Sequence, residues 1–281
     1  MKTAQTELRR TIGLPLLLFY GMGNIIGAGI YVLIGKVSGE AAMYAPVAFL
    51  VASLVAGFSA FSYSEMSARY PLSAGEAVYI DEGFHLKNLS RLTGLLIAVA
   101  GMVSAATIFR GFYGYFNSII QAPEIVVITA VILTLGLLTV WGISQSVAAA
   151  AALTVIEISG LLLIIWAGKD ILGTAPDQVE QLIPPFHISA WSGIFLGGFL
   201  AFFAFIGFED MVNIAEEVKH PQRTLPAAIL LALFFSTVIY TLVSVIAVLA
   251  MDSVAFSESK APLADLLSAT SEIDSRIISI S

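Results

Sequence analysis

Two apolar stretches of this chain carry residues suited to binding a small charged molecule. The first, residues 21–30, contains four glycines: Gly21, Gly23, Gly27 and Gly29. Because glycine weakens a helix, we expect a helix break here, with freed N–H groups that attract an anion such as a carboxylate. The alternative is close helix packing, since the glycines at positions 23 and 27 also form a small-xxx-small motif.

The second stretch, residues 202–210, follows an uncharged run and ends in Glu209 and Asp210. Carbonyl groups freed at a break here would suit a cation such as an ammonium group. An acid at membrane depth is a functional candidate, and the alternative is that the helix ends here and both acids lie in water. Interrupted helices in two halves of a chain indicate the substrate site of a transporter.

The composition indicates an integral membrane protein that is all-α. Of 281 residues, 58% are hydrophobic and 12% are charged, against about 25% charged in a soluble domain. Runs of about 20 apolar residues predict membrane spans within a single transmembrane domain, residues 1–281. We expect seven spans, over residues 12–35, 42–66, 91–117, 124–141, 145–168, 190–217 and 225–251.

Several classes of function are disfavoured. The chain has no cysteine, and its three histidines are scattered, so we expect no metal site and no cofactor. No nucleophile–base pair is visible, which argues against an enzyme. The net charge of −7 argues against nucleic-acid binding.

The distribution of lysine and arginine predicts a cytoplasmic N-terminus in the cell (plasma or inner) membrane. With that orientation, eight basic residues fall in inside segments and three, Lys36, Lys169 and Lys260, fall outside. Residues 276–281 resemble the start of a further apolar stretch, so we expect a truncated chain. Glu65 and Arg69, four residues apart, are expected to pair on one helix face.

Three motifs, in the expected order, resemble those of the amino acid–polyamine–organocation superfamily of permeases. Residues 23–30 (GNIIGAGI) resemble its first-helix motif. Residues 202–209 (FFAFIGFE) and 215–226 (AEEVKHPQRTLP) resemble its sixth helix and the following loop. Residues 64–71 (SEMSARYP) and 75–79 (GEAVY) resemble the end of its second helix and the next loop.

This resemblance implies a fold of two five-helix inverted repeats, of which this chain would supply helices 1–7. It also implies secondary active transport of amino acids by alternating access. The substrate carboxylate would lie against Ile26, Gly27, Ala28 and Gly29. The carbonyl groups of Phe203, Ala204 and Ile206 would hold the amino group, with Phe203 as an aromatic gate and Glu209 coupling the site to gating or protonation.

Proton-coupled members of the superfamily resemble this chain in the fifth helix but carry a lysine near the first-helix break. The position that matches this lysine in the present chain is Glu157, which is a departure from their pattern. It is either a proton or cation site or a carboxylate paired within the bundle. The apolar lining predicts neutral rather than cationic amino acids as substrates. The alternatives are a non-transporting fragment of a permease and a seven-helix receptor, although a receptor would have its N-terminus outside.

Overall fold

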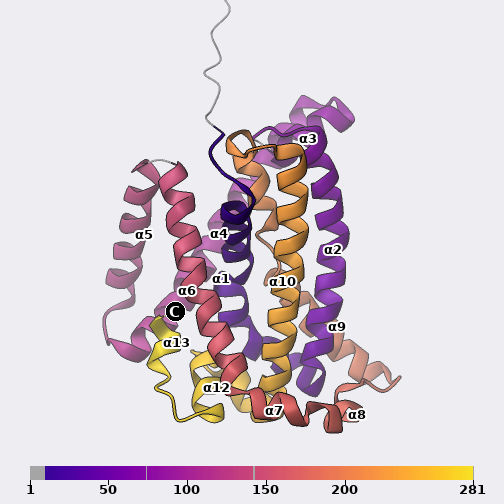
Figure 1. Cartoon of the computed structure of the whole chain (residues 1–281), viewed down its shortest axis with the longest axis vertical. Helices are drawn as coiled ribbons and strands as arrows, with labels where there is room; N and C mark the ends of the chain where they lie inside the picture. Colours follow the sequence, from indigo (N-terminus) through magenta and orange to yellow (C-terminus); the bar gives the residue numbers. More distant parts are fainter. Residues whose placement is uncertain (1–9, 74, 142, 281) are drawn as a thin grey trace, which may run out of the picture.

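The computed structural model describes residues 10–73, 75–141 and 143–280, which form a bundle of helices without an extended strand (Figure 1). The long helices are α1 (Leu14–Ala41), α2 (Ala45–Arg69), α4 (Lys87–Ile119), α5 (Glu124–Trp141), α6 (Ile143–Ala167), α9 (Ile188–Phe203) and α10 (Pro221–Ala250). The shorter elements are η1 (Ala42–Tyr44), α3 (Gly75–Phe84), α7 (Lys169–Thr174), η2 (Ala175–Gln178), α8 (Val179–Leu182), η3 (Phe208–Glu217), α11 (Ser253–Glu258), α12 (Pro262–Thr270) and α13 (Arg276–Ile280).

Five helical segments of the described chain are long and apolar enough to cross a membrane. They are Leu14–Arg69, Lys87–Asn117, Gln145–Ala167, Ile188–Glu217 and Pro221–Ala250. The first holds both α1 and α2, and α5 contains a shorter apolar helix, Glu124–Val140. Large apolar side chains such as Phe58, Leu137 and Val140 are more than two-thirds exposed, as expected for a surface that faces lipid. The chain is an all-α integral membrane protein.

Helix α1 lies at the centre of the bundle and packs against α6, α9 and α10. Beside it, α2 makes its most extensive packing with α10. The buried face of α2 carries alanines at helical spacing, at positions 45, 48, 52, 56 and 60. Such small side chains allow neighbouring helices to approach closely, which is how helices pack in lipid.

At the end of the bundle where α1 begins, the chain entering α1 pairs with the chain leaving η3. The N–H groups of Thr11 and Ile12 donate to the carbonyl oxygen of Glu217, at 2.9 and 3.0 Å, and the N–H of Lys219 donates to Ile12 at 2.8 Å. This pairing holds residues 11–12 extended, so the helix expected from residue 12 begins at Leu14. Two of the eight basic residues expected on the inside, Lys2 and Arg9, lie outside the described residues. The expected pair of Glu65 and Arg69 is confirmed at the end of α2.

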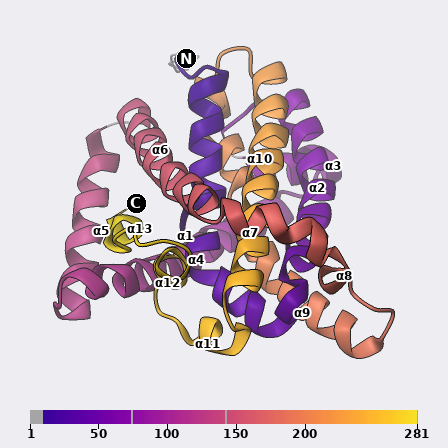
Figure 2. The same cartoon turned by 60° about the horizontal axis from the view of Figure 1, so that its bottom comes forward.

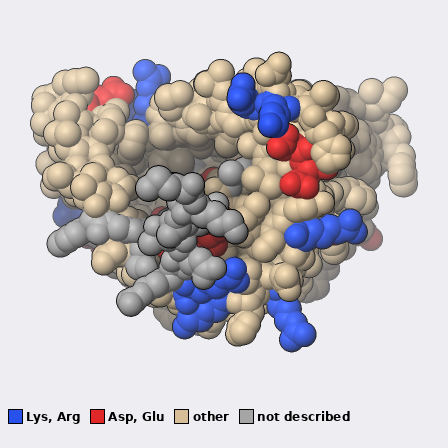
Figure 3. All heavy atoms as spheres, turned by 90° about the horizontal axis from the view of Figure 1, so that it is seen from above, with Lys and Arg blue, Asp and Glu red and all other residues tan. Residues whose placement is uncertain are grey.

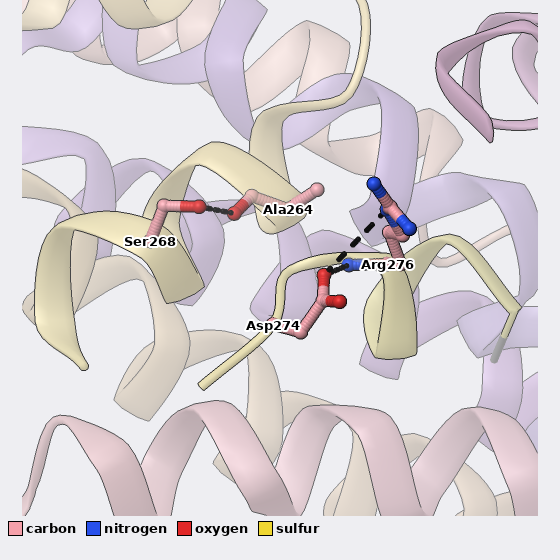
Figure 4. Close-up of polar contacts among 4 residues, drawn as sticks. All are labelled: Ala264, Ser268, Asp274 and Arg276. Carbon is pink, nitrogen blue, oxygen red and sulfur yellow. Dashed lines mark hydrogen bonds and ion pairs between the residues drawn. The ribbon is translucent and has the colours of Figure 1, made fainter. Parts of the chain in front are cut away.

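Short helices cover the opposite end, which Figure 2 brings forward. The segment 173–185 contains η2 and α8. Near the C-terminus, Oδ1 of Asp274 accepts a hydrogen bond from the N–H of Arg276 at 3.0 Å at the start of α13, as Figure 4 shows. This turn directs α13 onto α4 and buries Ile278.

Candidate binding site at two broken helices

The first break lies in α1 at Gly27, whose backbone angles (φ −4°, ψ −128°) leave the helical range. Ile26 beside it is completely buried. A Cβ atom at Gly27 would meet no atom within 4 Å, so this position borders open space. Ala28 and Gly29 continue the helix, and the side chain of Ala28 lies outside the described part of the structure.

The second break separates α9, which ends at Phe203, from η3, which begins at Phe208. The N–H of Ala204 donates to Ala201 at 3.0 Å and that of Ile206 donates to Phe203 at 3.3 Å, so the helix tightens into turns. Gly207 has a φ of +130°, a conformation that side chains disfavour. The backbone carbonyl of Asn24 also leaves no space for a Cβ atom there.

The two breaks lie against each other. A Cβ atom at Gly29 would fall 2.8 Å from the Cα atom of Ala204, so only glycine allows this approach. The hydroxyl group of Tyr240, from α10, lies 2.8 Å from the carbonyl oxygen of Ile25 and 3.0 Å from that of Ala204. Tyr240 is completely buried, and its single proton is shared between carbonyl groups of both breaks.

A cavity of about 180 Å³ opens beside the first break. Its lining includes Gly27, Tyr31, Tyr115 and Glu157. The Tyr31 hydroxyl donates to the backbone carbonyl of Glu157 at 2.9 Å, and the Tyr115 hydroxyl donates to that of Tyr31 at 2.5 Å. These bonds fix α1 between α4 and α6.

Glu157 is the acidic side chain of this cavity. Its Oε2 atom is buried and has no hydrogen-bond partner within the described ranges. No Lys, Arg or His of those ranges lines the cavity. A carboxylate in such surroundings is costly unless a proton or another cation neutralises it.

Glu209 occupies a different position. Its Oε2 atom accepts a hydrogen bond from the N–H of Gly207 at 2.8 Å, so the carboxyl group caps the second break. Phe203 is half-buried, Ala204 is buried and Ile206 is 37% exposed. The cavity lining contains Gly27 and Glu157 but none of Phe203, Ala204, Ile206 and Glu209. The structure thus brings the two backbones together at Gly29 and Ala204 and separates the two glutamates.

Two tyrosines that the sequence analysis did not select prove central. Tyr240 joins the breaks, and Tyr31 joins the first break to α6. The sequence offered one signal for them, the residue type, because a buried tyrosine in an apolar helix needs a partner for its hydroxyl group. Their partners are backbone carbonyl groups far away in sequence, which no local motif identifies.

The profile of the family described as "Amino acid permease" matches residues 12–274. The chain belongs to this family. The resemblance found in the three sequence motifs is therefore confirmed, and the chain is a transporter homologue with helices that span a membrane.

Individual relatives are transporters of several kinds. The chain is 32% identical over 266 residues to the vacuolar cationic amino acid transporter 2 of Arabidopsis thaliana, covering 86% of this chain and 41% of the relative. It is 28% identical over 269 residues to a branched-chain amino acid permease of Bacillus subtilis, covering 87% of this chain and 56% of the relative. It is also 28% identical over 262 residues to a methylthioribose transporter of the same bacterium, covering 85% of this chain and 55% of the relative. The chain thus spans about half the length of these relatives.

Proposed function

We propose that this chain carries out secondary active transport of amino acids across the cell membrane by alternating access. The observation that carries the proposal is the contact between the two broken helices at Gly29 and Ala204, with open space at Gly27. Two sets of freed backbone groups of opposite polarity therefore lie close together. A zwitterion has the matching pair of charges.

The substrate carboxylate would lie at the first break, against Ile26, Gly27, Ala28 and Gly29. The half-helix that follows Gly27 directs its N-terminal N–H groups toward the break, and the helix dipole adds positive potential there. The missing side chain at Gly27 would allow the carboxylate to reach these N–H groups.

The amino group would bind at the second break, where Phe203, Ala204 and Ile206 offer carbonyl oxygens. The Ala204 carbonyl already accepts from Tyr240, but a carbonyl oxygen has two lone pairs and can accept a second bond. Phe203, at the last turn of α9, would act as the aromatic gate.

Coupling would use two partly buried acids, Glu157 and Glu209. Glu157 would take a proton or cation in the cavity beside Gly27, because its Oε2 atom has no partner among the described residues. Glu209 would respond to movement of the second break through its bond to Gly207.

The orientation that fits the charges places the N-terminus in the cytoplasm. At the end of the bundle where α1 begins, basic residues lie near the helix ends: Arg10, Arg69, Lys87 and Lys219. Figure 3 views this end of the bundle and shows basic side chains around its rim. The chain would supply the first five-helix repeat, with α1 broken, and the start of an inverted second repeat, with the break after α9.

The test is binding and uptake of a labelled amino-acid panel by the purified chain, in detergent and in proteoliposomes. Gly27→Leu fills the open space at the first break, whereas Gly136→Leu, also free of neighbours within 4 Å, changes α5 far from both breaks. We expect saturable binding that Gly27→Leu abolishes and Gly136→Leu preserves. A folded chain that binds no amino acid would contradict the proposal and leave a non-transporting portion of a permease.

A further inference from the structure

A second, larger cavity of about 750 Å³ is lined by the half of α1 that lies away from its start, at Val32 and Lys36. Three cationic side chains line it: Lys36 of α1, Arg110 of α4 and Lys260 before α12. Within the described part of the chain, no acidic residue contributes to this lining. We call this cavity the basic vestibule.

Two glycines of α4, one turn apart, shape the walls of the basic vestibule. A Cβ atom at Gly111 would collide with the side chain of Val32, and one at Gly114 would fall 2.8 Å from the carbonyl oxygen of Lys260. Both α1 and the segment before α12 can therefore approach α4 closely. This packing holds the backbones that carry Lys36 and Lys260 at the rim of one cavity.

Neighbouring groups leave most of the positive charge in place. The ammonium group of Lys36 donates to the carbonyl oxygen of Ser257 at 2.6 Å, which positions the charge without neutralising it. Arg110 lies 3.9 Å from Glu124, and their side chains are 82% and 49% solvent-exposed. Lys260 forms no ion pair with any described residue. The nearby Asp265 accepts instead from the hydroxyl group of Ser259.

The basic vestibule adjoins the smaller cavity beside Gly27, because Val32 and Gly111 line both. A solute in the basic vestibule therefore lies next to the cavity that holds Gly27 and Glu157, with the contact between Val32 and Gly111 separating the two. A cleft lined by one sign of charge concentrates ions of the opposite sign and repels those of its own.

We propose that the basic vestibule binds the carboxylate group of an approaching amino acid and disfavours amino acids that carry net positive charge. The proposal rests on the proposed function and narrows its substrate class to neutral and acidic amino acids. Cationic substrates, named for the Arabidopsis relatives, are those that the vestibule repels.

The test uses the absence of cysteine from the sequence, so that one introduced cysteine is the only thiol. Asn117→Cys places it in the vestibule, and Ser189→Cys, near the start of α9, is the control at the same end. Each is treated with methanethiosulfonates carrying either a sulfonate or a trimethylammonium group. The ratio of the two rate constants, divided by the same ratio for a free thiol in solution, reports the local electrostatic potential. This measurement does not require transport.

We expect the sulfonate reagent to be favoured at Asn117→Cys over Ser189→Cys by about 3- to 10-fold, and less at high salt. Combining Lys36→Gln with Lys260→Gln should remove the preference, whereas Lys169→Gln should not. Glycine should slow the reaction at Asn117→Cys, and glycinamide, which lacks the carboxylate, should not.

Equal ratios at the two cysteines, or equal protection by glycine and glycinamide, would overturn the proposal. Thr107→Cys, which also lines the vestibule, gives the same readout should Asn117→Cys not fold. Loss of transport with these ratios intact would count against the proposed function alone.

Discussion

Tyr240 of α10 and Ile25 of α1 are joined by a hydrogen bond of 2.8 Å from the tyrosine hydroxyl group to the backbone carbonyl oxygen. The same hydroxyl lies 3.0 Å from the carbonyl oxygen of Ala204, after the end of α9. The side chain of Tyr240 thus holds both helices at the level of their breaks. This explains how two weakened helices keep a fixed relative position.

Tyr240→Phe removes this shared proton without changing the shape of the core. Two buried carbonyl groups would lose a donor, so we expect a loss of stability of about 1–2 kcal/mol. Thermal unfolding in detergent, followed by tryptophan fluorescence, measures it. Tyr113→Phe is the control, because its hydroxyl group bonds locally, to Asn117 and Ala122. Equal unfolding temperatures for the two variants would show that the bond does not stabilise the junction.

Gly29→Ala tests the contact between the two breaks. The added methyl group would lie 2.8 Å from the Cα atom of Ala204, and backbone there cannot yield as a flexible side chain does. We expect about 1–3 kcal/mol of destabilisation from overpacking, together with loss of amino-acid binding. Gly136→Ala, with nothing within 4 Å, should be neutral or stabilising by up to about 1 kcal/mol. The same unfolding measurement compares them, and an unchanged Gly29→Ala variant would mean that the helices do not touch there.

The sequence was sufficient for the fold class and for the location of both breaks, because these depend on local composition. Long apolar runs predict spanning helices, and the clustered glycines of residues 21–29 predict a weak helix position such as Gly27. The second break, between Phe203 and Phe208, lies within the expected residues 202–210. The family followed from three short motifs, and the family profile that matches residues 12–274 confirms it.

The distribution of the site between two regions could not be read from the sequence. Glu157 and Glu209 are both acids near breaks, yet only Glu157 borders the cavity beside Gly27. The difference arises because Glu209 turns back to the N–H of Gly207, two residues away. The roles of Tyr240 and Tyr31 depend on contacts 215 and 126 residues apart in the chain.

Glu157→Gln tests whether the unpartnered carboxyl group couples transport to protons. The amide cannot ionise, so we expect a chain of equal or higher thermal stability whose uptake no longer responds to a pH gradient. Uptake into proteoliposomes with and without an imposed gradient measures this. Glu124→Gln, at the exposed start of α5, should keep the wild-type response. A destabilised Glu157→Gln variant, or one with a full pH response, would contradict the role assigned to Glu157.

Ser73 and Glu216 form a reciprocal pair at the end where α1 begins. The N–H of Ser73 donates to Oε1 of Glu216 at 3.2 Å, and the N–H of Glu216 donates to the Ser73 hydroxyl at 3.1 Å. This pair joins the chain that follows α2 to the end of η3, next to the backbone pairing of Ile12 with Glu217. The pair therefore holds these two segments together at this end of the bundle.

Ser73→Ala removes one of these two bonds and leaves the backbone N–H of residue 73 in place. We expect the amide of Glu216 to exchange its hydrogen about 5- to 10-fold faster, because a net loss near 1 kcal/mol eases local opening. Hydrogen exchange followed by mass spectrometry on peptides covering residues 208–218 measures this. Peptides from the middle of α10 should exchange at the wild-type rate, since their helix is anchored elsewhere. Uniformly faster exchange in both regions would indicate global destabilisation and would exclude a local stabilising role for the pair of Ser73 and Glu216.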